Sequence, residues 1–63
     1  MHKLEYYLKE KNLTKTEFAE RVGIHLSYIT HLVKGRRVPS LSVALKIQDL
    51  TDGEVPVTTW VMR

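Results

Sequence analysis

The segment 26–34 carries side chains that can recognise the edges of nucleic-acid bases. The hydroxyls of Ser27 and Thr30 can donate or accept hydrogen bonds at base edges. The imidazole of His31 can donate to guanine N7 or O6, or to a phosphate. At the far end of the segment the chain places three cations that suit phosphate groups: Lys34, Arg36 and Arg37.

The charge of the chain is unevenly distributed along it. Residues 1–37 hold eight Lys/Arg and four Asp/Glu, a balance of +4, whereas residues 38–63 hold two and three, a balance of −1. A domain that is basic at one end is typical of a nucleic-acid binder. An ordinary solvated surface is the alternative that charge alone leaves open.

The length and composition restrict the class of protein. A chain of 63 residues is expected to form one domain, over 1–63. It has no cysteine, which excludes disulfides and thiolate metal sites and fits a reducing cytoplasm. The start of the chain is charged early, so we do not expect a signal peptide, and no apolar run is long enough for a transmembrane helix.

Apolar periodicity predicts four helices that position these side chains, over residues 3–11, 15–22, 26–34 and 41–50. Thr14 and Glu17 have the spacing of a capping box at the start of the second helix. Glycines can end the second and third helices, and Ser40 is the expected N-cap of the fourth. The fourth helix is predicted to be amphipathic through the apolar residues Leu41, Ala44, Leu45, Ile47 and Leu50.

The closing segment 55–63 has two possible readings. Alternation at Val55, Val57, Thr59 and Val61 favours a strand, whereas Val57, Trp60 and Val61 have helical spacing. We expect a short helical turn that folds Trp60 against the core.

The segment 15–34 has the features of two helices joined by a tight turn. Helices connected so closely must cross steeply, so a small residue is needed where their backbones meet, and Ala19 provides it. The turn needs a residue that tolerates positive φ, and Gly23 provides that. Ile24 is expected to fill the corner.

This pattern resembles the helix-turn-helix of the phage-repressor and Cro-type regulators, the XRE-like family of bacteria and phages. The resemblance covers roughly residues 3–50 and includes the flanks Leu13–Ala19 and Gly35–Leu41 and the signature Ala44–Ile47. It implies an all-α fold, a compact four- to five-helix lambda-repressor-like domain. It also implies a sequence-specific transcription regulator, of the repressor type, that reads the major groove of an operator. The apolar positions that carry the match are Phe18, Val22, Ile24, Ile29 and Leu32.

The helical period orients the third predicted helix. If Ile29 and Leu32 point inward, the opposite side carries Ser27, Thr30, His31 and Lys34. The resemblance implies that the N-terminal part of this helix reads bases. Many relatives carry a polar residue where this chain has Leu26, so their base preference does not transfer. The base-reading residues that we expect are Leu26, Ser27, Tyr28, Thr30 and His31.

Phosphate contacts are expected at both ends of the helix-turn-helix. The start of the second helix offers free N–H groups and the positive end of a dipole. Lys9 and Lys11 are expected to face solvent. The phosphate-binding residues that we expect are Thr14, Lys15, Lys34, Arg36 and Arg37.

Catalysis and metal binding are not expected. The carboxylates Asp49, Asp52 and Glu54 have the character of a solvated turn, without a nucleophile or base nearby in sequence. His25 and His31 are six positions apart and so do not share a helical face, and His25 is expected to cap the third helix. We therefore predict a non-enzymatic protein with no metal, cofactor, membrane or small-molecule ligand.

The expected partners are operator DNA and a second copy of the chain. Two copies on half-sites about 34 Å apart would form a homodimer on DNA in the bacterial cytoplasm. The dimer interface could use the apolar tail residues, or Trp60 could instead complete the monomer core. The alternatives are a protein-interaction module, such as an antitoxin-like or adaptor protein, and a non-specific nucleoid binder. The tail residues in question are Val55, Val57, Trp60, Val61 and Met62.

Overall fold

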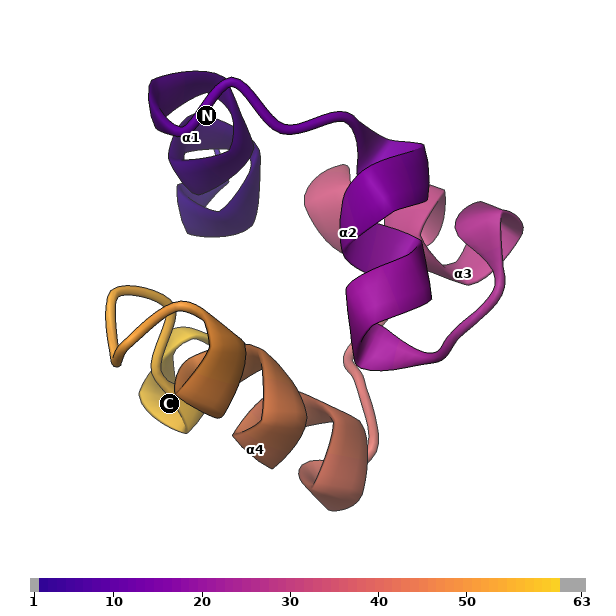
Figure 1. The fold of residues 1–63 in the computed structure, drawn as a ribbon. Helices are drawn as coiled ribbons and strands as arrows, with labels where there is room; N and C mark the ends of the chain where they lie inside the picture. The colour runs from indigo at the N-terminus through magenta and orange to yellow at the C-terminus, as the bar shows by residue number, and fades with distance from the viewer. Residues whose placement is uncertain (1, 61–63) are drawn as a thin grey trace.

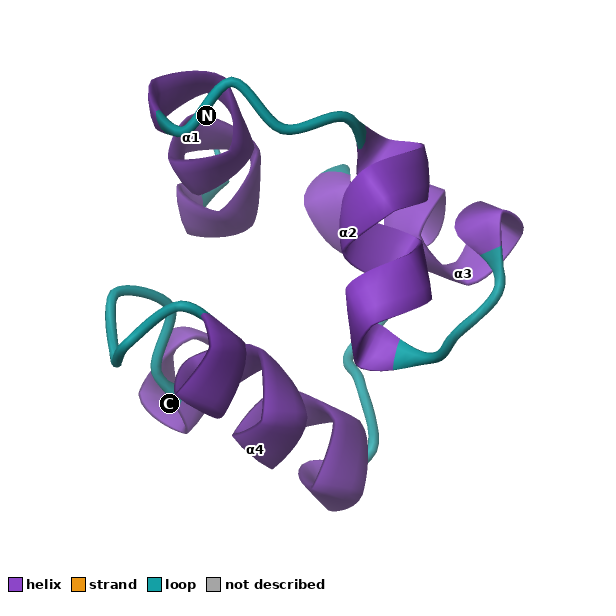
Figure 2. Cartoon of the chain, viewed as in Figure 1, coloured by secondary structure: helices purple, strands orange, loops and turns teal. Residues whose placement is uncertain are grey.

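The computed structural model describes residues 2–60, and within that part of the chain every regular element is helical. The elements are α1 (Lys3–Glu10), α2 (Lys15–Val22), α3 (Leu26–Val33), α4 (Leu41–Leu50) and the short 3-10 helix η1 (Val57–Trp60) (Figure 1). Short loops join them (Figure 2). The predicted all-α fold is confirmed. The predicted boundaries of α2 and α4 are correct, and α1 and α3 each end one residue earlier than predicted, with Lys11 and Lys34 as C-caps.

Each of the four α-helices begins at a side chain that accepts a hydrogen bond from the first turn. The caps are His2, Thr14, His25 and Ser40, in chain order. Such a cap satisfies one of the N–H groups that have no intrahelical partner. The predicted capping box, the Ser40 cap and the capping role of His25 are all present.

Gly23 ends α2 in the left-handed region, with φ of 84°, and its N–H donates to the Ala19 carbonyl at 2.8 Å. A residue with a Cβ rarely adopts this conformation, which explains the glycine. The turn is so short that α3 begins at Leu26 and packs directly against α2. The structure therefore contains the predicted helix-turn-helix.

All the helices contribute to one apolar core. α1 packs on α3, α2 packs on α3 and α4, and η1 packs on α4. Ala19 lies in this core where α2 meets its neighbours, as its small size predicts, and Ile24 is partly buried against it. The buried apolar side chains are Leu4, Leu8, Phe18, Ala19, Val22, Ile29, Leu32, Val33, Ala44, Ile47, Val55 and Trp60.

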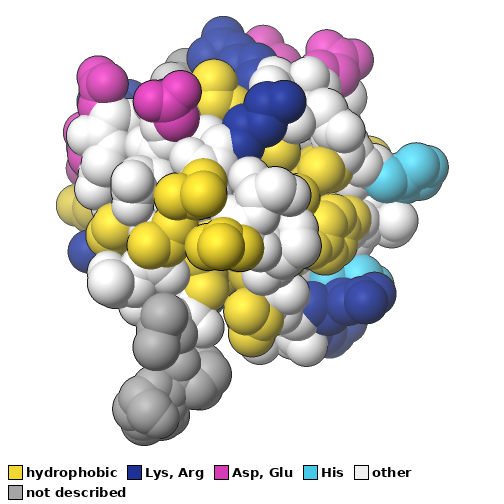
Figure 3. Space-filling model, turned by 90° about the horizontal axis from the view of Figure 1, so that it is seen from below, with side chains coloured by type: hydrophobic (Ala, Val, Ile, Leu, Met, Phe, Trp, Pro, Cys, Tyr) yellow, Lys and Arg dark blue, Asp and Glu magenta, His cyan; other side chains and the backbone are white. Residues whose placement is uncertain are grey.

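The apolar side chains of α4 divide between two faces. Ala44 and Ile47 are buried, but Leu41 and Leu45 are 69% and 47% exposed. Val38, just before the helix, is 59% exposed, and Leu50 is also exposed. The view from the α4 side shows apolar side chains gathered on this face of the molecule (Figure 3). The apolar residues from which the sequence predicts an amphipathic helix therefore do not all face the core.

The closing segment is a helical turn, as predicted, and not a strand. Trp60 is 5% exposed, and its ring stacks on His2 with centroids 4.7 Å apart. Thr51 is buried, and its hydroxyl donates to the Ile47 carbonyl and accepts from the Val55 N–H, which fixes the path into η1. Val55 and Trp60 thus belong to the monomer core, while Val61 and Met62 lie outside the described residues.

Candidate nucleic-acid interface

The residues of α3 that were predicted to read bases differ in their exposure. Ser27 is exposed, and Leu26 is 44% exposed. Tyr28, Thr30 and His31 are half-buried. The accessible surface of α3 is therefore widest at its N-terminal end. When the second helix of a helix-turn-helix lies in the major groove, this is the end that contacts base edges.

The hydroxyl protons of Ser27 and Thr30 are already used in hydrogen bonds within α3 and its cap. Thr30 Oγ1 donates to the Leu26 carbonyl at 3.0 Å, so its lone pairs remain free to accept. His25 Nδ1 accepts from the Ser27 N–H at 3.4 Å and lies 3.1 Å from Ser27 Oγ. With Nδ1 as the acceptor, the Ser27 hydroxyl donates to it and keeps its own lone pairs free. Both hydroxyls can thus offer acceptors to an incoming base edge.

Tyr28 faces the loop that follows α3. Its hydroxyl accepts from the Ser40 N–H at 3.4 Å, and the Arg37 guanidinium lies 5.8 Å from its ring centroid. Tyr28 therefore supports the basic loop and the start of α4. His31 Nδ1 is buried and has no hydrogen-bond partner among the described residues. A contact with another molecule would therefore use Nε2, the other ring nitrogen.

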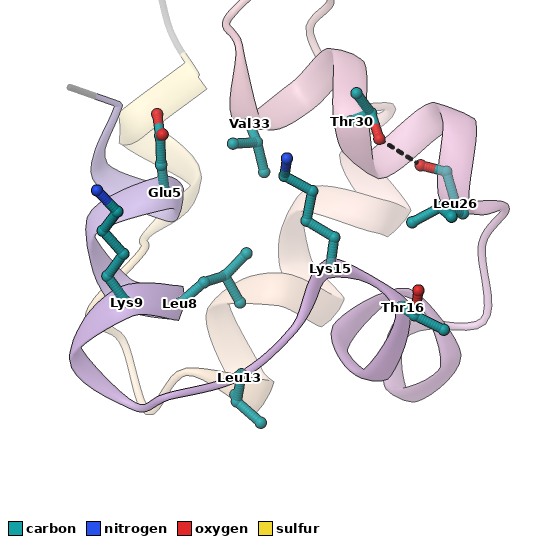
Figure 4. A pocket seen from close by; sticks show the side chains of 9 residues that line it. All are labelled: Glu5, Leu8, Lys9, Leu13, Lys15, Thr16, Leu26, Thr30 and Val33. Carbon is teal, nitrogen blue, oxygen red and sulfur yellow. Dashed lines mark hydrogen bonds between the residues drawn. The ribbon is translucent and has the colours of Figure 1, made fainter.

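A hollow of about 570 Å³ lies between the start of α2, the exposed edge of α3 and α1. Lys15 and Thr16 line it from α2, and Leu26 and Thr30 line it from α3. Figure 4 shows the Lys15 side chain extending from the start of α2 toward α3. The structure thus brings an expected phosphate contact beside two expected base readers. The remaining lining residues are Glu5, Leu8, Lys9, Leu13 and Val33.

Lys9 is exposed, as predicted, but it also lines this hollow. Its position follows from α1, because Leu4 and Leu8 are buried and Glu5 and Lys9 each come one residue later on the same edge. The neighbouring Lys11 instead forms an ion pair with Glu54, at 3.8 Å. The spacing of the α1 stripe could have indicated Lys9, but only the packing of α1 against α3 reveals the hollow.

In the capping box, the N–H and the hydroxyl of Thr14 are both used as hydrogen-bond donors to Glu17. The Thr14 hydroxyl accepts from the Glu17 N–H at 3.0 Å, and the Thr14 N–H donates to Glu17 Oε1 at 3.0 Å. The hydroxyl also lies 3.2 Å from that oxygen and donates to it. These bonds lower the pKa of Glu17. The donors left for an anion at this helix start are the backbone N–H groups of Lys15 and Thr16, which have no intrahelical acceptor.

The cations Lys34, Arg36 and Arg37 are all exposed where α3 ends. Gly35, with φ of 74°, turns the chain there, and the Arg36 N–H donates to the His31 carbonyl at 2.9 Å. The loop is thus held against the last turn of α3. Positive charge therefore stands beside the exposed edge of α3, where Lys15 lines the hollow, and also at its C-terminal end, in this loop.

The sequence profile of the helix-turn-helix family matches residues 4–56. This chain belongs to the helix-turn-helix family. A protein of Methanocaldococcus jannaschii that bears the name of an uncharacterized HTH-type transcriptional regulator is 39% identical over 46 residues. The alignment covers 73% of this chain and 70% of that relative. No solved structure gives a significant match.

The helix-turn-helix family match begins at the second residue of α1, contains α2 to α4 and ends before η1. Within residues 2–60 no three His, Asp or Glu side chains come together as a metal site, and no helix is long and apolar enough to cross a membrane. The carboxylates Asp49, Asp52 and Glu54 are exposed near the end of α4, as the sequence suggested.

Proposed function

We propose that this helix-turn-helix protein, a DNA-binding regulator of transcription, represses a target by placing α3 in the major groove of a specific operator. One observation carries the proposal. The accessible edge of α3 has two basic features next to it: the start of α2 lies beside it across the hollow, and the loop 34–37 lies at its C-terminal end. Phosphate contacts at these two places would hold α3 in register on the duplex while its side chains read bases.

In the proposed complex, Ser27 and Thr30 accept hydrogen bonds from base edges. Their protons are committed to His25 and to the Leu26 carbonyl, so they suit the donors in the major groove, adenine N6 and cytosine N4. Leu26 packs on a thymine methyl, and His31 contacts the same groove. Tyr28 acts by holding the Arg37 loop in place.

The phosphates on one side are bound by Lys15 and the first-turn N–H groups of α2, and Lys9 adds charge at the same hollow. On the other side they are bound by Lys34, Arg36 and Arg37. Thr14 contributes indirectly, because its capping bonds orient the first turn.

We further propose that two copies bind together. A half-site spacing of about 34 Å suits a molecule whose longest dimension is 29 Å. Because Val55 and Trp60 are buried in the monomer, we assign the contact between copies to the exposed apolar residues Val38, Leu41 and Leu45. Such a pair would act in the cytoplasm, where it meets DNA.

The same apolar face also supports the alternative of a protein-interaction module, since exposed apolar surface commonly marks a contact site. In that case DNA binding would be secondary, and a different protein would cover Leu41 and Leu45.

Selection of sites from a random DNA library, followed by titration of the winner at two salt concentrations, tests the proposal. We expect a palindrome with half-sites one helical turn apart and an affinity that falls steeply with salt. Salt-sensitive binding without enrichment would indicate a nucleoid binder instead. Absence of binding would favour the protein-interaction module.

A further inference from the structure

A second pocket, of about 220 Å³, lies away from the hollow beside α2. Its walls come from three parts of the chain that are distant in sequence. His2 precedes α1, residues Gly35, Arg37 and Val38 belong to the loop after α3, and Thr59 and Trp60 belong to η1. Of these residues, only Arg37 takes part directly in the proposed DNA contacts.

Two polar atoms buried in the wall residues have no hydrogen-bond partner among the described residues. They are Trp60 Nε1 and Thr59 Oγ1. The Trp60 side chain is only 5% exposed, and an indole N–H can only donate. Leaving a buried donor without an acceptor is costly, so a group that accepts hydrogen bonds from these atoms would stabilise the fold.

His2 adds a third donor. Its Nδ1 accepts from the Leu4 N–H at 3.1 Å, so in the neutral ring the proton is on Nε2. Burial lowers the pKa of His2, which favours this neutral form at pH 7. The stacking of its ring on Trp60 fixes its orientation.

The charge of the pocket has one sign. Arg37 supplies a guanidinium, and no Asp or Glu occurs among the residues that line the pocket in the described part of the chain. A guanidinium together with neutral N–H and O–H donors matches the geometry and charge of an oxyanion.

We propose that this pocket binds an oxyanion, a phosphate or a carboxylate, between Arg37, Thr59 and Trp60. Two sources offer the same chemistry: a free ion, which would make the pocket an effector site, and a phosphate of the DNA backbone. In the second case the inference rests on the proposed function, because Arg37 would then hold its DNA phosphate with help from η1.

The sequence contains one tryptophan, so a single indole N–H resonance reports on the pocket. The first arm titrates the full chain with inorganic phosphate at constant ionic strength, balanced with chloride, and follows that resonance. We expect a saturable downfield shift as Nε1 gains an acceptor. Thr59→Val, which removes one hydrogen bond, should weaken binding about fivefold. Arg37→Gln should weaken it about tenfold or more, because it removes a charged partner.

The matched control is Arg21→Gln, which removes the same charge from an exposed position on α2, outside the pocket wall. It should bind phosphate like the original chain. A loss equal to that of Arg37→Gln would show non-specific attraction and would overturn the site. Circular dichroism of each variant confirms that it is folded, and Thr59→Val keeps the side-chain shape if Arg37→Gln proves unstable.

The second arm adds operator DNA that carries its own fluorescent label, so that DNA binding is measured separately from the indole shift. An indole shift only with DNA, and lost in Thr59→Val, supports the site with a backbone phosphate as its source. DNA binding without an indole shift in either arm overturns the site and leaves the proposed function intact. If DNA does not bind, the proposed function fails and the phosphate arm alone decides: a saturable shift supports the site, and no shift overturns it.

Discussion

The hydroxyls of Ser27 and Thr30 illustrate how a neighbouring atom changes what a residue can recognise. A free hydroxyl donates and accepts, but the Thr30 proton is committed to the Leu26 carbonyl. His25, by capping α3, places its Nδ1 beside Ser27 Oγ in the same way. Both side chains are therefore expected to select base edges that donate.

Ser27→Ala tests this selection. We expect the preference for the operator over random DNA to fall by about 1–3 kcal/mol, while non-specific binding changes little. Competition titrations with operator variants measure the effect, and Thr58→Ala on η1 is the control. An unchanged preference at every base position would exclude Ser27 from the reading surface.

Arg36→Ala tests the phosphate assignment. Affinity should weaken for all sequences alike, and the slope of log affinity against log salt should become shallower by about 1. Lys46→Ala on α4 removes the same charge from another helix and serves as the control. If Arg36→Ala alters discrimination at only one base pair, Arg36 contacts a base and the assignment is incorrect.

At the scale of the elements, the start of α2 both stabilises the helix and offers N–H groups to a phosphate. The Thr14 and Glu17 bonds satisfy donors of the first turn and leave those of Lys15 and Thr16 for an anion. Thr14→Ala should lower the free energy of unfolding by about 1 kcal/mol. Urea denaturation measures it. No change in the midpoint would mean that the capping box does not stabilise α2.

The same helix start should respond to acid. The bonds from Thr14 lower the pKa of Glu17 in the folded chain. The ionised Glu17 carboxylate therefore stabilises the folded state at pH values above its ordinary pKa of 4.5. The effect is lost as the pH falls through the lower, folded pKa. The stability difference between the original chain and Glu17→Gln should therefore shrink in acid. A difference that stays constant down to low pH would contradict this origin.

The helix starts and ends could be predicted from the sequence because they depend on neighbouring residues. Thr14, Gly23 and Ser40 each act within a few positions of themselves. The orientation of α4 could not be predicted from the sequence, because Leu41 and Leu45 have the same helical spacing as a buried stripe. Which stripe is buried depends on α2 and η1, which pack on α4 from distant parts of the chain.

The candidate site shows the same division. The exposure of Ser27 followed from the period of α3, with Ile29 and Leu32 as the buried reference. The hollow that Lys9 lines could not be predicted from the period of any one helix, since the hollow forms only where α1 meets the helix-turn-helix. The bond that turns Tyr28 toward Ser40 likewise depends on the path of the loop between them.

At the scale of the whole molecule, the exposed face of α4 is the feature that binding by two copies would use. Leu41→Glu should leave the monomer folded, because this side chain is 69% exposed. It should weaken operator binding and remove the dimer, because a charge would lie in an apolar contact. Sedimentation on and off DNA measures the state of association.

Tyr6→Glu is the matched control for this variant, since Tyr6 is 57% exposed but lies on α1. A dimer that persists in Leu41→Glu would place the interface elsewhere. Loss of the dimer in both variants would point to net charge as the cause.

The stacking of His2 on Trp60 joins the two ends of the described chain. The helices themselves form from local contacts, which are fast to make, whereas this contact closes a loop of almost the whole chain. We therefore expect the tryptophan to respond late in folding, after the gain of helix that circular dichroism follows. In stopped-flow refolding, a fluorescence change slower than the gain of helix would mark the moment at which the ends meet.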